Sequence, residues 1–288
     1  MSTKRKQKAK ASQLEPTLRY ALYEAAVQDP FQQAHLFEKV YREKHGELPH
    51  ALREDFCGTF LISSEWVKRS PKNTAVALDL DPEPLAYGKR THYAKLNPSQ
   101  RKRLRVFEQN VLEGNSFKAD VIAACNFSFF TFKERATLIE YFRQAKKSLH
   151  PGGALVLEMA GGSGFIDTPF HEDREVQYVR GKHKGDPWFT YRWAHRSYEP
   201  LTHHGLYTIG FTMETGEKYP DAFVYDWRVW TLPEVQECAQ EAGFTDIRVY
   251  WECEDEDDGD GESTYELITE AGNEYETWIA YVAAFVSS

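Results

Sequence analysis

One expected turn and an acid further along the chain have the residue types and spacing of a nucleoside-binding site. The expected strand at residues 51–55 ends in Glu54 and Asp55, the turn after it contains Cys57 and Gly58, and Asp79 ends the next expected strand. A glycine lets a ligand approach the backbone closely. A carboxylate about 20 residues further on is well placed to accept hydrogen bonds from both hydroxyls of a ribose. Gly58 and Asp79 therefore indicate a site for a nucleoside.

Two further expected strands are followed by asparagine side chains. Asn110 and Val111 come after the third expected strand, at residues 104–108, and Asn126 follows the fourth, at residues 119–125. A polar side chain at position 110 can contact the edge of an adenine. Because ligands of open α/β sheets bind at the carboxyl ends of the strands, we expect all of these residues in one crevice. The chain lacks a G-x-G-x-x-G run, which argues against a nicotinamide dinucleotide as the ligand.

The elements that position these residues follow from the hydrophobic pattern. Helices are expected at residues 14–28 and 31–45, where apolar residues recur at helical spacing. Capping boxes at Thr131–Glu134 and Thr231–Glu234 predict two more helix starts. Strands that alternate with helices are typical of right-handed βαβ units and of a parallel sheet covered on both faces. The five strands of this part are expected at residues 51–55, 74–79, 104–108, 119–125 and 154–159.

After residue 160 the pattern changes. Short alternating runs within residues 176–230 predict antiparallel hairpins, and two final strands are expected at residues 246–252 and 278–286. The predicted fold class is α/β, with a Rossmann-like, seven-stranded, mostly parallel sheet, helices on both faces and an antiparallel β insertion. We divide the chain into a disordered basic tail, a ligand-binding core with N-terminal helices, a substrate-capping insertion and a closing helix with two strands. These parts span residues 1–13, 14–160, 161–230 and 231–288.

Four motifs occur in an order that resembles a known family. EDFCGT, ALDLDPEPLAYG, FEQNVLEG and SLHPGGALVLEM, at this spacing, are similar to the motifs of class I S-adenosylmethionine-dependent methyltransferases. The resemblance covers roughly residues 50–160 and the tail from about residue 231. LREDFCGT together with DWRVWTLPE looks more closely like a poorly characterised bacterial and plant subgroup of these enzymes. The resemblance implies S-adenosyl-L-methionine as the cofactor.

The resemblance also implies roles for individual residues at the first motif. Glu54 matches its acid, a role that the neighbouring Asp55 can share, and the pair Cys57 and Gly58 lies near the methionine moiety. The family motif has three glycines, and only Gly58 is present here.

The later motifs imply further contacts. Asp79 matches the ribose-binding acid, and Asn110 matches a position that contacts the adenine amino group, with the backbone N–H of Val111 beside it. At the first motif, Phe56 and Phe60 stand where the family has two of its three glycines, and their side chains crowd the turn.

The resemblance gives weak catalytic candidates in Asn126 and Phe129. The run Asn126–Phe129 stands where amino-methylating enzymes carry an Asn/Asp-Pro-Pro-aromatic motif, but both prolines are missing. A role for Asn126 in lining the cofactor site is therefore favoured. No general base is obligatory, because the sulfonium makes the methyl group reactive and positioning can supply most of the catalysis. The histidines lack metal-ligand spacing, so no metal site is expected.

Aromatic residues are concentrated between residues 188 and 230. This stretch holds twelve of them, about twice the number that the chain average of 14% predicts. They can pack the antiparallel layer against the main sheet, or they can line a substrate pocket. The substrate candidates are Tyr191, Trp193, Tyr225 and Trp227, which form two same-face pairs by the period of two.

Composition limits the partners. The net charge is −9, which argues against a nonspecific nucleic-acid binder, although the tail at residues 4–10 is basic. Eight acids crowd residues 252–262 and miss the register of a calcium loop, so a solvated loop is expected. No apolar run reaches the roughly 20 residues of a membrane span, and no apolar segment follows the basic N-terminus as in a secretory signal. Four widely spaced cysteines favour reduced thiols and a cytoplasmic location.

Three hypotheses remain open from the sequence. The first is a methyltransferase that acts on a small-molecule acceptor by in-line transfer. The second is a catalytically inert S-adenosylmethionine-binding or regulatory module, because two motif glycines are replaced. The third is a nucleic-acid methyltransferase, against which the net charge argues. The acceptor atom and the oligomeric state are not encoded in any pattern that we recognise.

Overall fold

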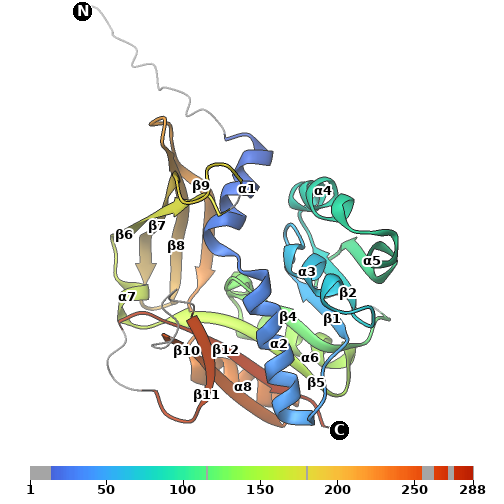
Figure 1. Ribbon diagram of the computed structural model, residues 1–288. Helices are drawn as coiled ribbons and strands as arrows, with labels where there is room; N and C mark the ends of the chain where they lie inside the picture. Colours follow the sequence, from blue (N-terminus) through green and yellow to red (C-terminus); the bar gives the residue numbers. More distant parts are fainter. Residues whose placement is uncertain (1–13, 115, 180, 255–262, 272–275, 288) are drawn as a thin grey trace, which may run out of the picture.

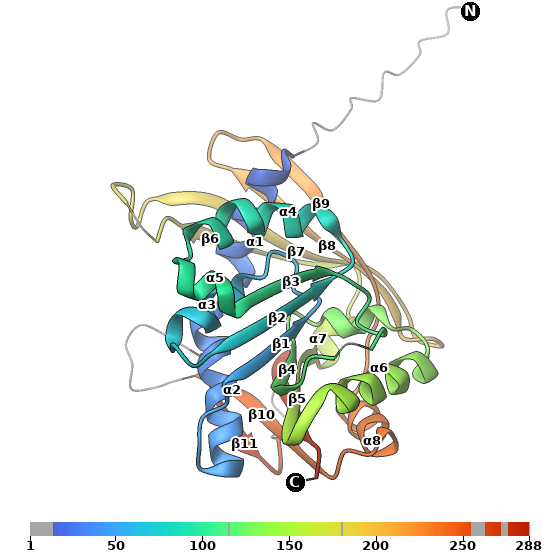
Figure 2. The same ribbon diagram turned by 90° about the vertical axis from the view of Figure 1, so that its right-hand side faces the viewer.

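The computed structural model describes residues 14–114, 116–179, 181–254, 263–271 and 276–287. The expected disordered tail at residues 1–13 and most of the acidic run at residues 252–262 lie outside the described residues. Within the described part, a large mixed sheet with helices on both faces carries a separate antiparallel sheet on one side (Figures 1 and 2).

The main sheet has eight strands in the order β11-β10-β12-β5-β4-β1-β2-β3. Strands β1 to β5 are parallel to one another, whereas β12, β10 and β11 are joined by antiparallel pairing. The chain order reverses between β1 and β4, which is the position where open α/β sheets bind their ligands. The strands are β1 (Ala51–Asp55), β2 (Thr74–Asp79), β3 (Leu104–Glu108), β4 (Ala119–Ala124), β5 (Leu149–Gly161), β10 (Asp246–Glu254), β11 (Ser263–Ile268) and β12 (Trp278–Phe285).

The prediction of seven strands was wrong by one strand. The unexpected strand is β11, a short edge strand that pairs only with β10 and follows the acidic run. Its sequence, STYELI, is short and half polar, and among residues 264–268 only Tyr265 is buried. A strand of this kind forms because β10 offers it backbone partners, and the hydrophobic pattern of its own residues does not predict it.

Helices cover both faces of the main sheet (Figure 2). Helices α2 (Pro30–His45) and α3 (Leu61–Arg69) pack with one set of strand residues, which includes Ala75 and Ala77. Helices α6 (Arg135–Ser148) and α8 (Leu232–Ala242) pack with the other set, which includes Val76 and Leu78. The alternation shows that these strands are buried on both faces, as a near-continuous apolar run predicts. The remaining helical segments are α1 (Pro16–Val27), α4 (Pro82–Thr91), η1 (Tyr93–Lys95), α5 (Pro98–Arg103), η2 (Ser128–Thr131) and α7 (Ser163–Ile166).

The two predicted capping boxes have different outcomes. Thr231 and Glu234 form the predicted box at the start of α8. The prediction at Thr131 was wrong, because residues 128–131 form a 3₁₀ turn and α6 begins at Arg135, with Glu134 as a cap that makes no side-chain bond. Tertiary packing decides the difference, since the two phenylalanines of this turn, Phe129 and Phe130, are fully buried.

The second sheet has four antiparallel strands in the order β6-β7-β8-β9. They are β6 (Phe170–Gln177), β7 (Pro187–Glu199), β8 (His204–Met213) and β9 (Lys218–Arg228). Helix α1 packs its apolar face, which includes Leu22 and Ala26, against this sheet and contacts α4 on its other side (Figure 1). Helix α1 therefore bridges the antiparallel sheet and the carboxyl side of the main sheet. No helix among the described residues is long and apolar enough to cross a membrane.

Candidate functional site

A cavity of about 250 Å³, here called the edge cavity, lies at the carboxyl ends of β1, β2 and β4. Six of the eight residues that the sequence assigned to the cofactor line it. It is closed on the other side by α1, through Tyr20 and Tyr23, and by Phe223 and Tyr225 of the antiparallel sheet. The six residues are Glu54, Asp55, Cys57, Gly58, Asp79 and Asn126.

The loop after β1 is held against Asp79. The backbone N–H of Gly58 donates to Oδ2 of Asp79 at 2.7 Å, and that of Asp81 donates to Oδ1 at 2.8 Å. Burial raises the pKa of the Asp79 carboxyl above its usual value, and the backbone donors oppose this shift. A Cβ atom on Gly58 would meet no heavy atom within 4 Å, so the space over this residue is open to a ligand.

Alternate residues of this loop are left-handed, with φ of 55° at Phe56, 51° at Gly58 and 48° at Phe60. Bulky residues rarely adopt this conformation. Phe56 lines the edge cavity. Its ring is edge-on to those of Phe132 and Tyr141, with ring centroids 5.6 and 5.8 Å away. Phe60 is fully buried and does not line the edge cavity. The loop therefore keeps the backbone conformation expected of glycines, and the Phe60 ring does not block the cavity.

The two acids at the end of β1 have different partners. Glu54 accepts the Ser63 N–H at 2.8 Å and the Ser63 hydroxyl through Oε2. Burial raises its pKa to about 7. Asp55 is paired with Arg53, whose Nε donates to Oδ1 at 2.6 Å, and it accepts the Tyr141 hydroxyl at 3.0 Å. Oε1 of Glu54 makes no hydrogen bond to another described residue, so Glu54 is the better placed of the two to bind a ligand.

The cofactor candidates Asn110 and Val111 and the catalytic candidate Phe129 do not line the edge cavity. Oδ1 of Asn110 accepts the N–H of Leu112 at 3.0 Å, and Val111 is buried, with its carbonyl accepting from Arg53 at 3.3 Å. The structure therefore does not bring Asn110 and Val111 to the other cofactor candidates, and an adenine contact at these positions stays a prediction. Phe129 is fully buried, with its ring edge-on to that of Phe130, and it does not line the edge cavity.

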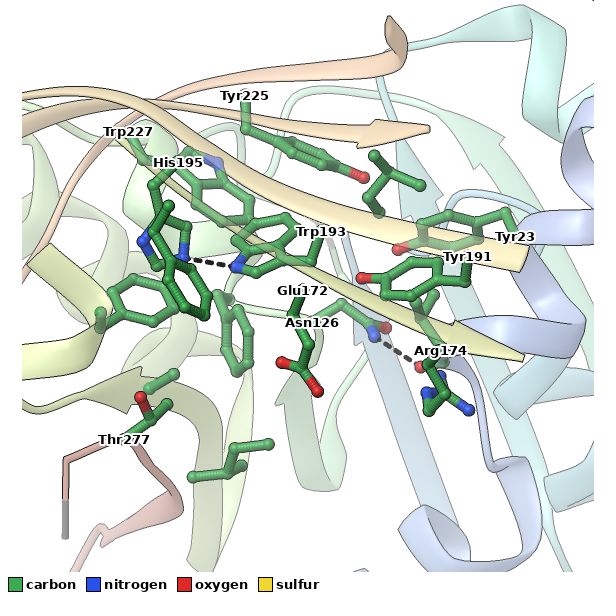
Figure 3. A pocket seen from close by; sticks show the side chains of 17 residues that line it. Tyr23, Asn126, Glu172, Arg174, Tyr191, Trp193, His195, Tyr225, Trp227 and Thr277 are labelled. Atoms are coloured by element: carbon green, nitrogen blue, oxygen red, sulfur yellow. Dashed lines mark hydrogen bonds between the residues drawn. The ribbon is translucent and has the colours of Figure 1, made fainter. Parts of the chain in front are cut away.

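A second cavity, of about 270 Å³, lies beside the first and is here called the aromatic cavity. All four substrate candidates, Tyr191 and Trp193 on β7 and Tyr225 and Trp227 on β9, line it (Figure 3). The rings of Tyr225 and Trp227 are stacked with centroids 4.4 Å apart. The same rings also pack against the core clusters. The packing and pocket interpretations of these aromatic residues therefore both apply.

His195 lines the aromatic cavity as a neutral ring. Its Nε2 accepts the indole N–H of Trp193 at 2.7 Å, and its Nδ1 lies 3.0 Å from the Asp167 carbonyl oxygen. Because an indole nitrogen can only donate, Nδ1 carries the proton. Burial lowers the pKa of this imidazole. Both ring nitrogens are occupied, so His195 is a poor candidate for a base.

Sequence reasoning missed Glu172 and Arg174, which line the aromatic cavity from the edge strand β6. Their run, FHEDREVQ, has a period of two, but Val176 is its only buried residue. The two apolar residues of the run, Phe170 and Val176, lie on the same face as Glu172 and Arg174 and mark it as the inward face. Because the hairpins were expected within residues 176–230, most of this run lay outside them. Among the described residues, no cluster of three or more His, Cys, Asp or Glu is arranged to hold a metal ion.

Three residues line both cavities: Tyr23 of α1, Asn126 at the end of β4, and Tyr225 of β9. Asn126 is left-handed, with φ of 53°. Its backbone N–H donates to the buried Glu158 at 2.8 Å, and its Nδ2 donates to the Val27 carbonyl at 3.0 Å. The three residues form the boundary at which the contents of the two cavities would meet.

Known proteins were compared with the chain. No family model matches it, and no curated protein sequence matches it either. Its structure is similar to that of the sugar N-methyltransferase KedS8 from Streptoalloteichus sp. ATCC 53650, with 16% identity, a TM-score of 0.62, and coverage of 100% of this chain and 98% of that chain. It is also similar to SAM-bound CalS10, an amino pentose methyltransferase from Micromonospora echinaspora, with 14% identity, a TM-score of 0.63, and coverage of 92% and 96%.

A third similar structure is a S-adenosylmethionine-dependent methyltransferase from Clostridium acetobutylicum ATCC 824, with 14% identity, a TM-score of 0.62, and coverage of 94% and 97%. The fold is that of the class I methyltransferases. The predicted fold class is thereby confirmed, with eight strands in the main sheet instead of seven. Within this methyltransferase fold, the edge cavity occupies the switch point between β1 and β4.

Proposed function

We propose that this chain is a methyltransferase that uses S-adenosyl-L-methionine and acts on a small-molecule acceptor. The observation that carries the proposal is the meeting of the edge cavity and the aromatic cavity at Tyr23, Asn126 and Tyr225. A donor in the edge cavity and an acceptor in the aromatic cavity would have their reacting atoms at this boundary. The four-stranded sheet is accordingly assigned as the unit that caps the acceptor.

The edge cavity offers the polar groups that the cofactor needs. Asp79 would bind the ribose hydroxyls, since each carboxylate oxygen keeps a lone pair after accepting one backbone N–H. Glu54 and the open space over Gly58 would receive the methionine part, close to Cys57. Bound S-adenosylmethionine supplies a sulfonium methyl group that needs no further activation. The protein's contribution is then to orient the two partners and to exclude water.

The aromatic cavity supports a small acceptor. It is walled by rings of β7 and β9 and has the size of a pocket for a compact molecule. Two of the similar structures are named as methyltransferases of a sugar and of an amino pentose. The net charge of −9 gives no support to a nucleic acid as the acceptor. We also infer a cytoplasmic location, which the four free cysteines support.

The substitution Asp79→Ala tests the cofactor assignment. We expect titration calorimetry to show S-adenosylmethionine binding to the wild type and at least about tenfold weaker binding to the variant, which is about 1.4 kcal/mol. Asp173→Asn is a control, because Asp173 pairs with Arg192 on the exposed part of the antiparallel sheet. Equal affinities of Asp79→Ala and the wild type would contradict the assignment of Asp79 to the ribose.

Isotope transfer separates an enzyme from an inert binding module. The protein is incubated with S-adenosylmethionine labelled on its methyl group and with the small-molecule fraction of a cell extract. Label in a new compound supports catalysis. Tight cofactor binding without any transfer favours the binding module instead, and a salt-dependent gel shift that disappears when residues 1–12 are deleted would favour a nucleic-acid acceptor.

A further inference from the structure

Glu172 presents a solvent-exposed carboxylate to the aromatic cavity, in whose lining Arg174 is the other charged side chain. It lies on β6 directly opposite Trp193 of β7, and its side chain points into the cavity, which Asn126 also lines (Figure 3). Within the described part of the chain it makes no ion pair and no hydrogen bond. Its neighbour Asp173, which faces the other side of the strand, pairs with Arg192 at 2.6 Å. The absence of a partner is therefore specific to the acid that faces the cavity.

The other charged side chain in the cavity lining, Arg174, has partners other than Glu172. Arg174 donates a hydrogen bond to the Ala26 carbonyl of α1. Its guanidinium lies 5.3 Å from the ring centroid of Tyr191, and Figure 3 shows both side chains. The remaining ionisable ring on this side, His195, is neutral because burial lowers its pKa. Glu172 is thus a carboxylate of the cavity lining that forms no ion pair with the one guanidinium in that lining.

The walls of this part of the cavity add to the same preference. Trp193, Tyr225 and Trp227 line it with rings that contact one another, with Trp193 and Trp227 centroids 6.1 Å apart. The faces of indole and phenol rings attract cations, most strongly where water is excluded. A carboxylate beside such rings is the combination that binds an ammonium group, since the acid supplies the charge and the rings supply contact with the carbon atoms around it.

We propose that the acceptor is a small aliphatic amine, bound as its ammonium ion with Glu172 as the counter-ion. The inference rests on the proposed methyltransferase function and names the acceptor class of that site. The ammonium ion gives up one proton to water, and the freed nitrogen lone pair forms a bond to the methyl carbon. The carbon–sulfur bond breaks, and its electron pair stays on sulfur. The products are the N-methylated ammonium ion and S-adenosylhomocysteine.

Three probes that share a benzyl group test the charge preference by calorimetry, with and without S-adenosylhomocysteine. They are benzylamine, benzyltrimethylammonium and benzyl alcohol. We expect both cations to bind the wild type at least about tenfold more tightly than the alcohol, equivalent to about 1.4 kcal/mol. Glu172→Gln is expected to remove this preference, because it keeps the shape of the side chain without its charge. Glu175→Gln is the matched control on the same strand, and it should keep the preference.

The outcomes are distinct. Equal affinity of the wild type for the cations and the alcohol, or an unchanged preference in Glu172→Gln, overturns the amine assignment. The wild-type comparison decides the question even if the variant does not fold. Failure of S-adenosylhomocysteine to bind would instead overturn the proposed function, because the preference for cations is also measured without it. Transfer of labelled methyl to benzylamine, but not to benzyl alcohol, would support both.

Discussion

The ring of Phe60 lies against the backbone of Gly88, so that the loop after β1 and helix α4 share one contact. A Cβ atom on Gly88 would stand 2.5 Å from Cε1 of Phe60 and 2.2 Å from the carbonyl oxygen of Thr59. Gly88 is buried in α4, and Phe60 has no exposed surface. The missing side chain in the helix thus makes room for a phenylalanine at a position where the class I motif has a glycine. The loop that carries Gly58 depends on this fit.

We expect Gly88→Ala to destabilise the protein, although alanine is the better helix former. The new methyl group meets a backbone oxygen that cannot rotate away, and overpacking of this kind costs roughly 1–3 kcal/mol. Urea unfolding measures the loss. Gly114→Ala is the control, because its nearest atom would be the Gln144 side chain at 3.7 Å, an ordinary contact. Equal stability of the two variants would show that the loop adapts to the methyl group.

Glu54 makes the stability of the protein depend on pH. Burial raises its pKa from 4.5 to about 7. Between these values the folded state holds a proton that the unfolded state has lost, so the contribution is fully present below pH 4.5 and disappears as the pH rises through about 7. A pKa difference of this size corresponds to about 3 kcal/mol. We expect the fall in unfolding free energy between pH 4.5 and 8 to be smaller by about this amount in Glu54→Gln.

The comparison with Glu54→Gln isolates one carboxyl group. Asp55 and Glu158, whose pKa values burial also raises, titrate in both proteins and cancel in the difference. Glutamine keeps an oxygen that accepts the Ser63 N–H, so the local hydrogen bond survives. Parallel pH profiles for the wild type and the variant would mean that folding does not raise the pKa of Glu54.

The parallel strands of the main sheet could be predicted because their residue types alone indicate burial. Residues 74–79 are buried on both faces, so an apolar, β-branched run is enough to identify the strand. The same reasoning fails for β11, which is held by its pairing with β10. Identical capping patterns at Thr131 and Thr231 also gave different results. Local patterns predict an element only where long-range packing agrees with them.

The edge cavity was more predictable than the aromatic cavity for a related reason. Parallel strands bring their carboxyl ends together, so Gly58, Asp79 and Asn126 meet once the strands are placed. Asn110 and Val111 belong to the same scheme by motif, but the turn after β3 keeps them away from the cavity. In β6 only Phe170 and Val176, at the ends of an otherwise polar run, mark the inward face, and the position of the second sheet over the first depends on long-range packing.

We expect His195 to be neutral, with its proton on Nδ1, at pH 7. The Trp193 indole N–H occupies Nε2, and Nδ1 donates to the Asp167 carbonyl. Burial lowers the pKa of the ring, so its stabilising effect is present above its usual value of 6.5 and declines as the pH falls below that. Long-range proton–nitrogen NMR spectra identify the protonated nitrogen, with exposed His183 as the internal comparison. A signal of an Nε2-protonated or charged ring at pH 7 would contradict the assignment.

Glu24 connects helix α1 to the loop after β1, which lines the edge cavity. It offers a test of whether α1 supports that loop. Its Oε1 accepts the Thr59 hydroxyl at 2.5 Å and lies 2.6 Å from Nε2 of His92 on the segment after α4. The Tyr87 hydroxyl donates to Oε2 at 3.4 Å. One half-buried carboxylate thus joins α1, the loop after Gly58 and α4. Removing it leaves three polar groups without their acceptor.

We expect Glu24→Ala to lower the unfolding free energy by about 2 kcal/mol, because hydrogen bonds to a charged group are among the stronger ones. We also expect faster amide hydrogen exchange in residues 16–27, since α1 then loses its polar link to the loop at Thr59 and keeps its apolar contacts with the antiparallel sheet and its contact with Glu83 of α4. Glu237→Ala changes an exposed acid on α8 and should alter neither quantity. Unchanged exchange in α1 would mean that packing against β8 and β9 holds the helix in place. In that case, a loss of cofactor affinity in Glu24→Ala would have to come from the loop at Thr59 alone.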